Sequence, residues 1–170
     1  MLPISITTHA WTSASPERVL AAARGFSPAR RERTWPNVSA KHLEVHTQGD
    51  RFAEVTEGTM ALGIWWERCR YDWSEPGVVT ATVIDSNVYH PELSGFVWRA
   101  RERGTGSVVE MTIYRDFRPR PKGLAAAALY GLARSRWLGG MQRQVLQAIE
   151  REAADEGVHG REAATADIGG

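Results

Sequence analysis

The chain has 170 residues and a formal net charge of +1, with 42% hydrophobic residues and charges of both signs along its length. These values favour one globular domain with a sizeable core, and they argue against a nucleic-acid-binding protein, which carries a clear excess of basic residues. No apolar run approaches the length that crosses a bilayer, so we expect no stable membrane insertion. The only cysteine, Cys69, excludes an internal disulfide and any multi-cysteine metal site.

The first residues, MLPISITTHAW, contain neither a basic segment nor the apolar run of a signal peptide. The sequence therefore predicts a cytoplasmic protein.

The N-terminal part of the chain predicts a strand followed by two short helices. Residues 4–11 alternate β-forming and polar side chains, which is typical of a strand. Ser15 followed by Pro16 is a helix-start signal, because serine caps the first turn and proline fits the first helical position. Residues 26–33 predict a second short helix, which Pro36 ends.

The middle of the chain consists of strand-like segments separated by turns that contain Gly, Pro or Asp. We expect six strands, over residues 38–47, 51–59, 62–73, 78–88, 96–103 and 107–117. Strands that are joined by short turns pair antiparallel, so these segments predict an antiparallel sheet.

A long helix is predicted over residues 122–154. Leu138, Met141, Val145 and Ile149 recur at three- and four-residue spacing, which gives this helix an apolar face that needs a large surface to cover it. The whole order predicts an α+β fold with its helices on one side of the sheet. Residues 155–170 lack apolar periodicity, so we expect a domain over residues 1–154 and a flexible C-terminal tail.

This order of elements resembles the START-like superfamily of helix-grip proteins, also called SRPBCC, which includes polyketide cyclases/dehydratases, lipid-transfer domains and Bet v 1-type ligand carriers. The resemblance spans residues 4–154 and rests on the order of elements more than on any one motif. Its matching stretches are residues 14–19, Trp35-Pro36, Trp66-Glu67-Arg68, residues 71–77 and residues 106–110. The resemblance implies a curved sheet of about seven strands wrapped around the C-terminal helix, with a ligand cavity between them.

The sequence holds no P-loop, no GxGxxG after a strand, no HExxH and no GxSxG. Among the histidines only His42 and His46 are close together, on one face of a predicted strand. Four strand residues span about 13 Å, which is too far for the two side chains to share one metal ion. We therefore expect neither a metal site nor a cofactor.

Strand alternation predicts two charged residues on otherwise apolar inner faces. On the strand at 62–73, Glu67 shares its face with Trp65, Cys69, Tyr71 and Trp73. On the strand at 107–117, Arg115 shares its face with Val109, Met111, Ile113 and Phe117. On the strand between them, Phe96, Trp98 and Ala100 are predicted to face inward.

Two interpretations of these charges are open. In the structural one, Glu67 and Arg115 neutralise each other or pair with Asp85 or Asn87, because buried charges need partners. In the functional one, Arg115 binds a ligand carboxylate, carbonyl or enolate, and Glu67 moves a proton because burial raises its pKa. The two interpretations are compatible, since a paired acid in a cavity can do both.

The predicted catalytic residues are Glu67, Arg115 and Tyr71, whose hydroxyl could donate a hydrogen bond to a ligand oxygen. The predicted ligand contacts are Trp65, Trp73, Asp85, Asn87, Trp98, Met111, Ile113, Phe117 and Met141. The tryptophans suit either a flat aromatic ligand or a filled core. Cys69 is expected to be a small buried apolar residue.

These observations predict a protein that binds a hydrophobic or aromatic small molecule and resembles the polyketide cyclase/dehydratase branch. For an enzyme, the resemblance implies cofactor-free catalysis, in which Arg115 stabilises an enolate and Glu67 or Tyr71 transfers the proton. The alternatives are a non-catalytic carrier or sensor with the same cavity, and an interaction module whose core is filled by tryptophan. The sequence does not predict the oligomeric state.

Overall fold

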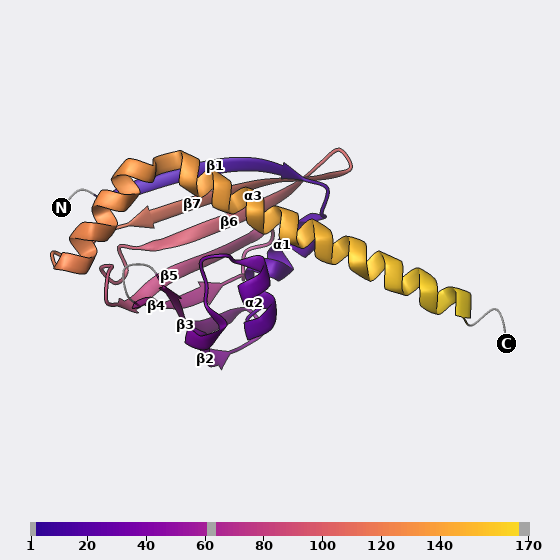
Figure 1. The fold of residues 1–170 in the computed structure, drawn as a ribbon, viewed down its shortest axis with the longest axis horizontal. Helices are drawn as coiled ribbons and strands as arrows, with labels where there is room; N and C mark the ends of the chain where they lie inside the picture. Colours follow the sequence, from indigo (N-terminus) through magenta and orange to yellow (C-terminus); the bar gives the residue numbers. More distant parts are fainter. Residues whose placement is uncertain (1–2, 61–63, 167–170) are drawn as a thin grey trace.

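A computed structural model of the chain describes residues 3–60 and 64–166, and it confirms the predicted α+β order of elements (Figure 1). The elements are β1 (Ile4–Thr12), α1 (Pro16–Ala23), α2 (Pro28–Thr34), the 3₁₀ turn η1 (Ala40–His42), β2 (Glu44–Gln48), β3 (Phe52–Met60), β4 (Ile64–Asp72), β5 (Val78–Ser86), β6 (Gly95–Arg103), β7 (Gly106–Arg115) and α3 (Pro121–Ala166).

The seven strands form one curved antiparallel sheet in the order β1-β7-β6-β5-β4-β3-β2 (Figure 1). Strands β2 to β7 follow one another as neighbours, while β1 pairs with β7 from Ile4 opposite Arg115 to Thr12 opposite Ser107. The long helix α3 crosses one face of the sheet, contacts β1 along its length and also contacts α1 and α2. The sheet and α3 together therefore enclose the core, as the helix-grip architecture requires.

Local sequence signals explain how α1 begins and how α3 is attached to it. The Ser15 side chain accepts a hydrogen bond from the Arg18 N–H at 3.4 Å, which caps the first turn as predicted. One carboxylate oxygen of Glu150 on α3 accepts hydrogen bonds from the Thr12 hydroxyl and from the N–H and hydroxyl of Ser13. The link between β1 and α1 is thus fastened to the middle of α3.

The predicted strand at residues 38–47 is wrong in its first half. Residues 40–42 form η1 instead, and the exposed strand β2 begins only at Glu44. The cause is tertiary packing against β3, where a Cβ atom on Gly58 would lie 2.7 Å from the Cβ of His42. The Ser39 N–H also donates to the Gly58 carbonyl at 3.0 Å, so the turn is held against that glycine. His42 and His46 therefore do not share one strand.

The helix α3 is longer than predicted, since it continues to Ala166 rather than ending at Ala154. Figure 1 shows its C-terminal part projecting past the edge of the sheet. Apolar periodicity in the sequence identifies only the part of a helix that packs against the rest of the protein. Residues 155–166 have no such apolar face, and half of them are Ala, Glu or Arg, which favour a helix without burial. Whether residues 155–170 form a flexible tail remains a prediction.

The predicted inner faces of β6 and β7 are buried, as are Trp65, Cys69 and Tyr71 on β4, whereas Glu67 and Trp73 are only partly buried. The three arginines at 99, 101 and 103 are exposed. A β-bulge interrupts β5, because Arg68 pairs with Asp85 whereas Cys69 pairs with Val83, which leaves Ile84 as an extra residue. The Ser86 hydroxyl then accepts hydrogen bonds from the N–H groups of Val88 and Tyr89, and the strand ends there. The chain consequently leaves the sheet earlier than its β-forming sequence predicts.

Two glycine-to-alanine substitutions should change stability in opposite directions. Gly140 lies inside α3 with no atom within 4 Å of the added Cβ, so Gly140→Ala should stabilise the protein by about 1 kcal/mol through helix propensity. At Gly95 the added Cβ would collide with the Ala81 carbonyl and the Tyr114 hydroxyl, so Gly95→Ala should destabilise it by about 1–3 kcal/mol. Urea unfolding of both variants measures these changes. If both substitutions change the unfolding free energy in the same direction, the tight packing around Gly95 is contradicted.

Candidate functional site

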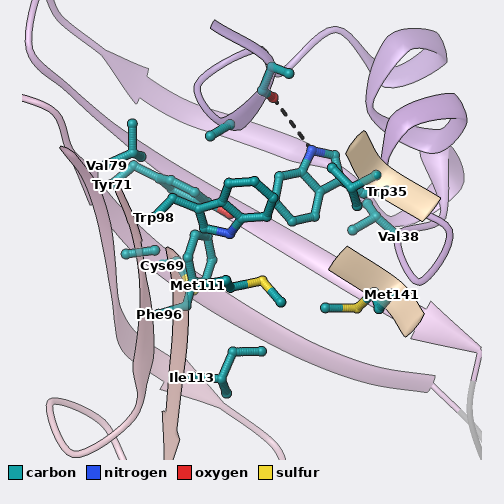
Figure 2. Packing of buried hydrophobic residues seen from close by; sticks show 14 of the residues in the cluster. Trp35, Val38, Cys69, Tyr71, Val79, Phe96, Trp98, Met111, Ile113 and Met141 are labelled. Atoms are coloured by element: carbon teal, nitrogen blue, oxygen red, sulfur yellow. Dashed lines mark hydrogen bonds between the residues drawn. The ribbon is translucent and has the colours of Figure 1, made fainter. Parts of the chain in front are cut away.

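A cavity of about 160 Å³ lies between the inner face of the sheet and α3. The strands contribute Glu57, Thr59, Trp65, Trp66, Glu67, Phe96, Met111, Ile113 and Arg115 to its wall. The helix α3 contributes Leu129, Tyr130, Trp137 and Met141, and the remaining wall includes Arg31, Trp35, Val38 and Tyr89. Figure 2 shows Met111 and Met141 pointing toward one another across this interior, with Trp35 and Trp98 beside them. The wall is mostly apolar and aromatic, and its charges come from two arginine–glutamate pairs.

The first pair joins Arg115 of β7 to Glu67 of β4. The Arg115 Nη2 donates to Glu67 Oε1 at 3.3 Å, and its Nη1 donates to the Gly95 carbonyl at 2.9 Å. The guanidinium also lies 4.5 Å from the centre of the Tyr89 ring. The Arg115 side chain is 5% exposed and that of Glu67 is 18% exposed. Arg115 and Glu67 therefore pair with each other, as the structural interpretation of the sequence predicts.

This pair does not use up the hydrogen-bonding capacity of its members. Within the part of the chain that the structure describes, Glu67 Oε2, Arg115 Nε and Trp65 Nε1 are buried and have no hydrogen-bond partner. A buried polar atom without a partner costs about 1–3 kcal/mol, so such atoms are uncommon and need an explanation. All three residues line the cavity, which makes these atoms suitable contacts for a polar group of a ligand or for water.

Burial shifts the protonation of Glu67. Loss of water raises the pKa of its carboxyl, Arg115 lowers it in part, and the charge of Glu57 raises it again, so that the pKa lies above its usual value. A hydrogen bond from the Cys69 thiol and the charge of Arg31 also lower the pKa of Glu67, but together with Arg115 they do not reverse the effect of burial. For Arg115 burial is the largest influence and lowers the pKa, but the charges of Glu67, Tyr89, Tyr130 and Cys69 together outweigh it, so the pKa is raised. Arg115 is therefore a permanent cation, while Glu67 is the group that can exchange a proton.

The second pair, Arg31 of α2 with Glu57 of β3, was not predicted. The Arg31 Nε donates to Glu57 Oε1 at 2.7 Å, its Nη2 donates to the Tyr71 hydroxyl at 2.8 Å, and its Nη1 donates to the Ala22 and Ala23 carbonyls. The Tyr71 hydroxyl donates in turn to Glu57 Oε2 at 2.7 Å. This closed network satisfies both carboxylate oxygens, so it differs from the pair at Glu67.

The network also places Tyr71, one of the predicted catalytic residues. Its side chain is fully buried and does not line the cavity. Burial raises the pKa of the Tyr71 hydroxyl well above its usual value, and the neighbouring Glu57 carboxylate adds to this effect. The Tyr71 hydroxyl thus keeps its proton and donates it in the hydrogen bond to Glu57.

The two glutamates face each other directly, because Glu57 on β3 pairs with Glu67 on β4 in the sheet register. Side chains opposite each other on one face lie about 4.5–5.5 Å apart at Cβ, so like charges there repel. Glu57 accepts two short hydrogen bonds, while Glu67 accepts one longer bond and has one oxygen without a partner. The Glu57 charge is accordingly one of the causes that raise the pKa of Glu67.

The other predicted contacts divide into two groups. Trp65, Met111, Ile113 and Met141 line the cavity. Trp98, Phe117, Trp73, Asp85 and Asn87 do not line it. Trp98 and Phe117 are core residues, packed on Trp35 and between Tyr89 and Tyr130. Trp73 donates to the Asp50 carbonyl at a turn.

Asp85 and Asn87 lie outside the cavity because the bulge and the turn at Ser86 end β5 there. Asp85 is exposed and pairs with Arg118 at 3.6 Å. Asn87 bonds to the backbone of Trp66 and Ile64 at 3.1 and 2.9 Å. The alternative prediction, in which Asp85 or Asn87 pairs with Glu67 or Arg115, is therefore wrong.

Sequence reasoning could have found Glu57 but not its partner. Glu57 alternates with the apolar residues Ala53 and Val55, which is the same signal that identified Glu67. Arg31 lies among other arginines in a short helix, where nothing distinguishes the buried one. The aromatic wall from Trp35, Tyr89 and Tyr130 also lacked a signal, since these residues lie in loops or on a helix. Within residues 3–60 and 64–166, no three His, Cys, Asp or Glu side chains gather into a candidate metal centre.

No protein-family model and no curated protein sequence matches the chain, whereas solved structures do. The Zhui aromatase/cyclase from a Streptomyces species has 15% identity and a TM-score of 0.69, over 89% of this chain and 96% of that one. A protein from Thermus thermophilus has 14% identity and a TM-score of 0.69, over 88% and 99%. A START superfamily protein from Mycobacterium smegmatis has 13% identity and a TM-score of 0.55, over 83% and 97%. These likenesses show that the chain has the START-like helix-grip fold that its sequence predicted.

The structural weight of the Arg31 network can be measured against a surface pair on the same helix. Removing one member of a buried ion pair leaves an uncompensated charge, so Arg31→Met should cost about 3–5 kcal/mol of unfolding free energy. The neighbouring Arg30 pairs with Glu152 at a partly exposed site, and Arg30→Met should cost less than about 1 kcal/mol. Urea unfolding of the two variants tests this, and similar losses would contradict the assigned burial of the network.

The raised pKa of Glu67 should be visible in the pH dependence of stability. Between its usual pKa and its raised pKa, folded Glu67 holds a proton that the unfolded chain has released, so stability falls as pH rises through this window. The unfolding free energy of the wild type, relative to that of Glu67→Gln, should therefore decrease from acid toward neutral pH and then level off. If the unfolding free energies of the two proteins change in parallel with pH, the pKa of Glu67 is not raised in the folded protein.

Proposed function

We propose that this protein binds a small aromatic molecule bearing an oxygen function in the cavity, and that it acts on it without a cofactor in the manner of a polyketide cyclase/dehydratase. The observation that carries the proposal is the pairing of Arg115 and Glu67 at an aromatic wall, with unsatisfied polar atoms on both residues and on Trp65. A charged pair costs free energy in a core that serves only packing, so its incomplete satisfaction supports a ligand role. The solved structures that share this fold include aromatase/cyclases, which supports the same proposal.

The chemistry follows from the two protonation states. Arg115 is a fixed cation that can hold a carbonyl oxygen and stabilise it as the enolate forms. The ionised carboxylate of Glu67 takes a proton from the carbon next to that carbonyl, and the electron pair moves to the oxygen beside Arg115. The Glu67 carboxyl then returns the proton to carbon, or to a hydroxyl that leaves as water in a dehydration. The raised pKa of Glu67 suits it to both steps.

The cavity volume limits the ligand. An apolar cavity of about 150 Å³ is enough to hold a single-ring molecule such as benzene, whereas sites for drug-sized ligands measure about 300–1,000 Å³. A long poly-carbonyl chain would therefore require α3 to move away from the sheet. A non-catalytic carrier is the second candidate, and the existing Arg115–Glu67 pairing favours it, because mutual neutralisation suits an apolar guest. The cavity itself argues against a core filled by tryptophan.

Ligand binding can be tested by quenching of tryptophan fluorescence with toluene and with phenol. The wild type should bind both probes saturably. Binding should quench the fluorescence, because Trp35, Trp65 and Trp137 line the cavity. The double variant Arg115→Met/Glu67→Gln should still bind toluene but should lose about tenfold or more in affinity for phenol, which forfeits a hydrogen bond to a charged group. A matched control is Arg99→Met/Glu110→Gln, which removes an arginine–glutamate pair of 3.1 Å on the outer face of the same sheet.

Catalysis can be separated from carriage by following exchange of the methyl protons of acetophenone in D₂O by NMR. An enzyme should accelerate this exchange, and Glu67→Gln should abolish the acceleration while Glu110→Gln leaves it intact. A carrier should bind acetophenone without accelerating the exchange. If none of the three probes, toluene, phenol and acetophenone, binds saturably, the proposed ligand site is contradicted.

A further inference from the structure

The first half of α3 is apolar on the side that faces away from the protein. Residues 123–133, GLAAAALYGLA, contain no charged side chain. Ala126 and Tyr130 point into the core and are buried, whereas Leu124 is 58% and Leu132 is 88% exposed. A helix that is apolar all round normally lies in a protein core or in contact with lipid. Here only the inner side is covered by the described part of the chain.

The charges around this apolar stretch are all positive in the sequence. Between Asp116 and Glu150 the chain has six basic residues and no acidic one. Arg120 and Lys122 are exposed just before the stretch, and Arg136 is exposed just after it. The nearby acid Asp85 is paired with Arg118. Two copies of this surface would bring like charges together, so the charge pattern disfavours a homodimer and favours an anionic partner.

The dimensions and the aromatic residues favour a lipid surface. Eleven helical residues span about 16 Å, roughly half the thickness of a bilayer core. Among the described helices none is long and apolar enough to cross a membrane. Trp137 is half-exposed at the end of the stretch and packs on Tyr130 at 5.4 Å between ring centres. Tryptophan and tyrosine are the residues that prefer the interface between lipid and water.

We propose that the outer face of α3 from Lys122 to Trp137 docks the protein onto bilayers that contain anionic lipids. The leucines enter the boundary between headgroups and acyl chains, and the flanking cations contact the lipid phosphates. Leu129 and Trp137 both line the cavity and are half-exposed, so the cavity reaches the surface beside this face. Docking in this orientation would let an apolar ligand pass between the bilayer and the cavity. Only this ligand exchange rests on the proposed function; the docking itself does not.

Vesicle flotation tests the docking with the full chain. We expect binding to vesicles of equal parts phosphatidylcholine and phosphatidylglycerol, weak binding to phosphatidylcholine alone, and a decrease with added salt. The variant Leu124→Glu/Leu132→Glu should bind the mixed vesicles at least about tenfold more weakly, because each exposed leucine loses its burial in lipid. Neither leucine lines the cavity, so phenol binding should be unchanged.

A matched control is Trp11→Glu, which replaces a 56% exposed apolar side chain on β1, at the end of the sheet where Trp11 pairs with Val108. It should leave vesicle binding unchanged. Replacing Arg120 and Lys122 with glutamine should weaken binding to the mixed vesicles by about fivefold per charge.

Three results would overturn the proposal. The first is no flotation with either vesicle. The second is binding that depends on salt but is unaffected by the leucine substitutions, which would indicate simple charge attraction. The third is a concentration-dependent dimer that the leucine substitutions abolish without any vesicle binding, which would assign this face to a second copy of the chain.

Discussion

Two arginine–glutamate pairs buried between the sheet and the helices are the interactions on which the rest of this structure depends. Removing ions from water is expensive, and an arginine–glutamate pair offsets that cost only when further hydrogen bonds satisfy its remaining donors and acceptors. Arg31 and Glu57 meet this condition through Tyr71 and two carbonyls. They connect α2 to β3 and β4 and to the end of α1, and they hold the short helices against the sheet.

The other pair does not meet that condition, and the candidate site is the result. Arg115 and Glu67 share one bond of 3.3 Å and leave an oxygen and a nitrogen without partners in the described chain. The repulsion from Glu57 across the register raises the pKa of Glu67 further. One glutamate is therefore fully hydrogen-bonded within the fold, whereas its direct neighbour is the one to which our proposal gives the proton transfer. Two contacts distinguish the pairs: Glu57 receives the Tyr71 hydroxyl, and its bond from Arg31 measures 2.7 Å against 3.3 Å from Arg115 to Glu67.

The helix α3 connects this interior to the outside of the molecule. Its buried face supplies Met141 and Tyr130 to the cavity wall, and Glu150 fastens it to the start of α1. Its first half presents leucine to solvent between clusters of positive charge. In our proposals the same segment covers the ligand site and contacts the bilayer, so a movement of this segment would open the cavity at the lipid surface.

The sequence by itself determined the order of elements, the antiparallel sheet and the inner faces of β4, β6 and β7, because alternation and helical spacing are properties of neighbours along the chain. It also identified Glu67 and Arg115 as charges on apolar faces. Tertiary structure alone decided that these two meet, that Arg31 pairs with Glu57, and that His42 turns onto Gly58. It also decided that Asp85 and Asn87 leave the site at a bulge. These outcomes depend on which distant segments approach one another, and periodicity within one segment contains no information about its partner.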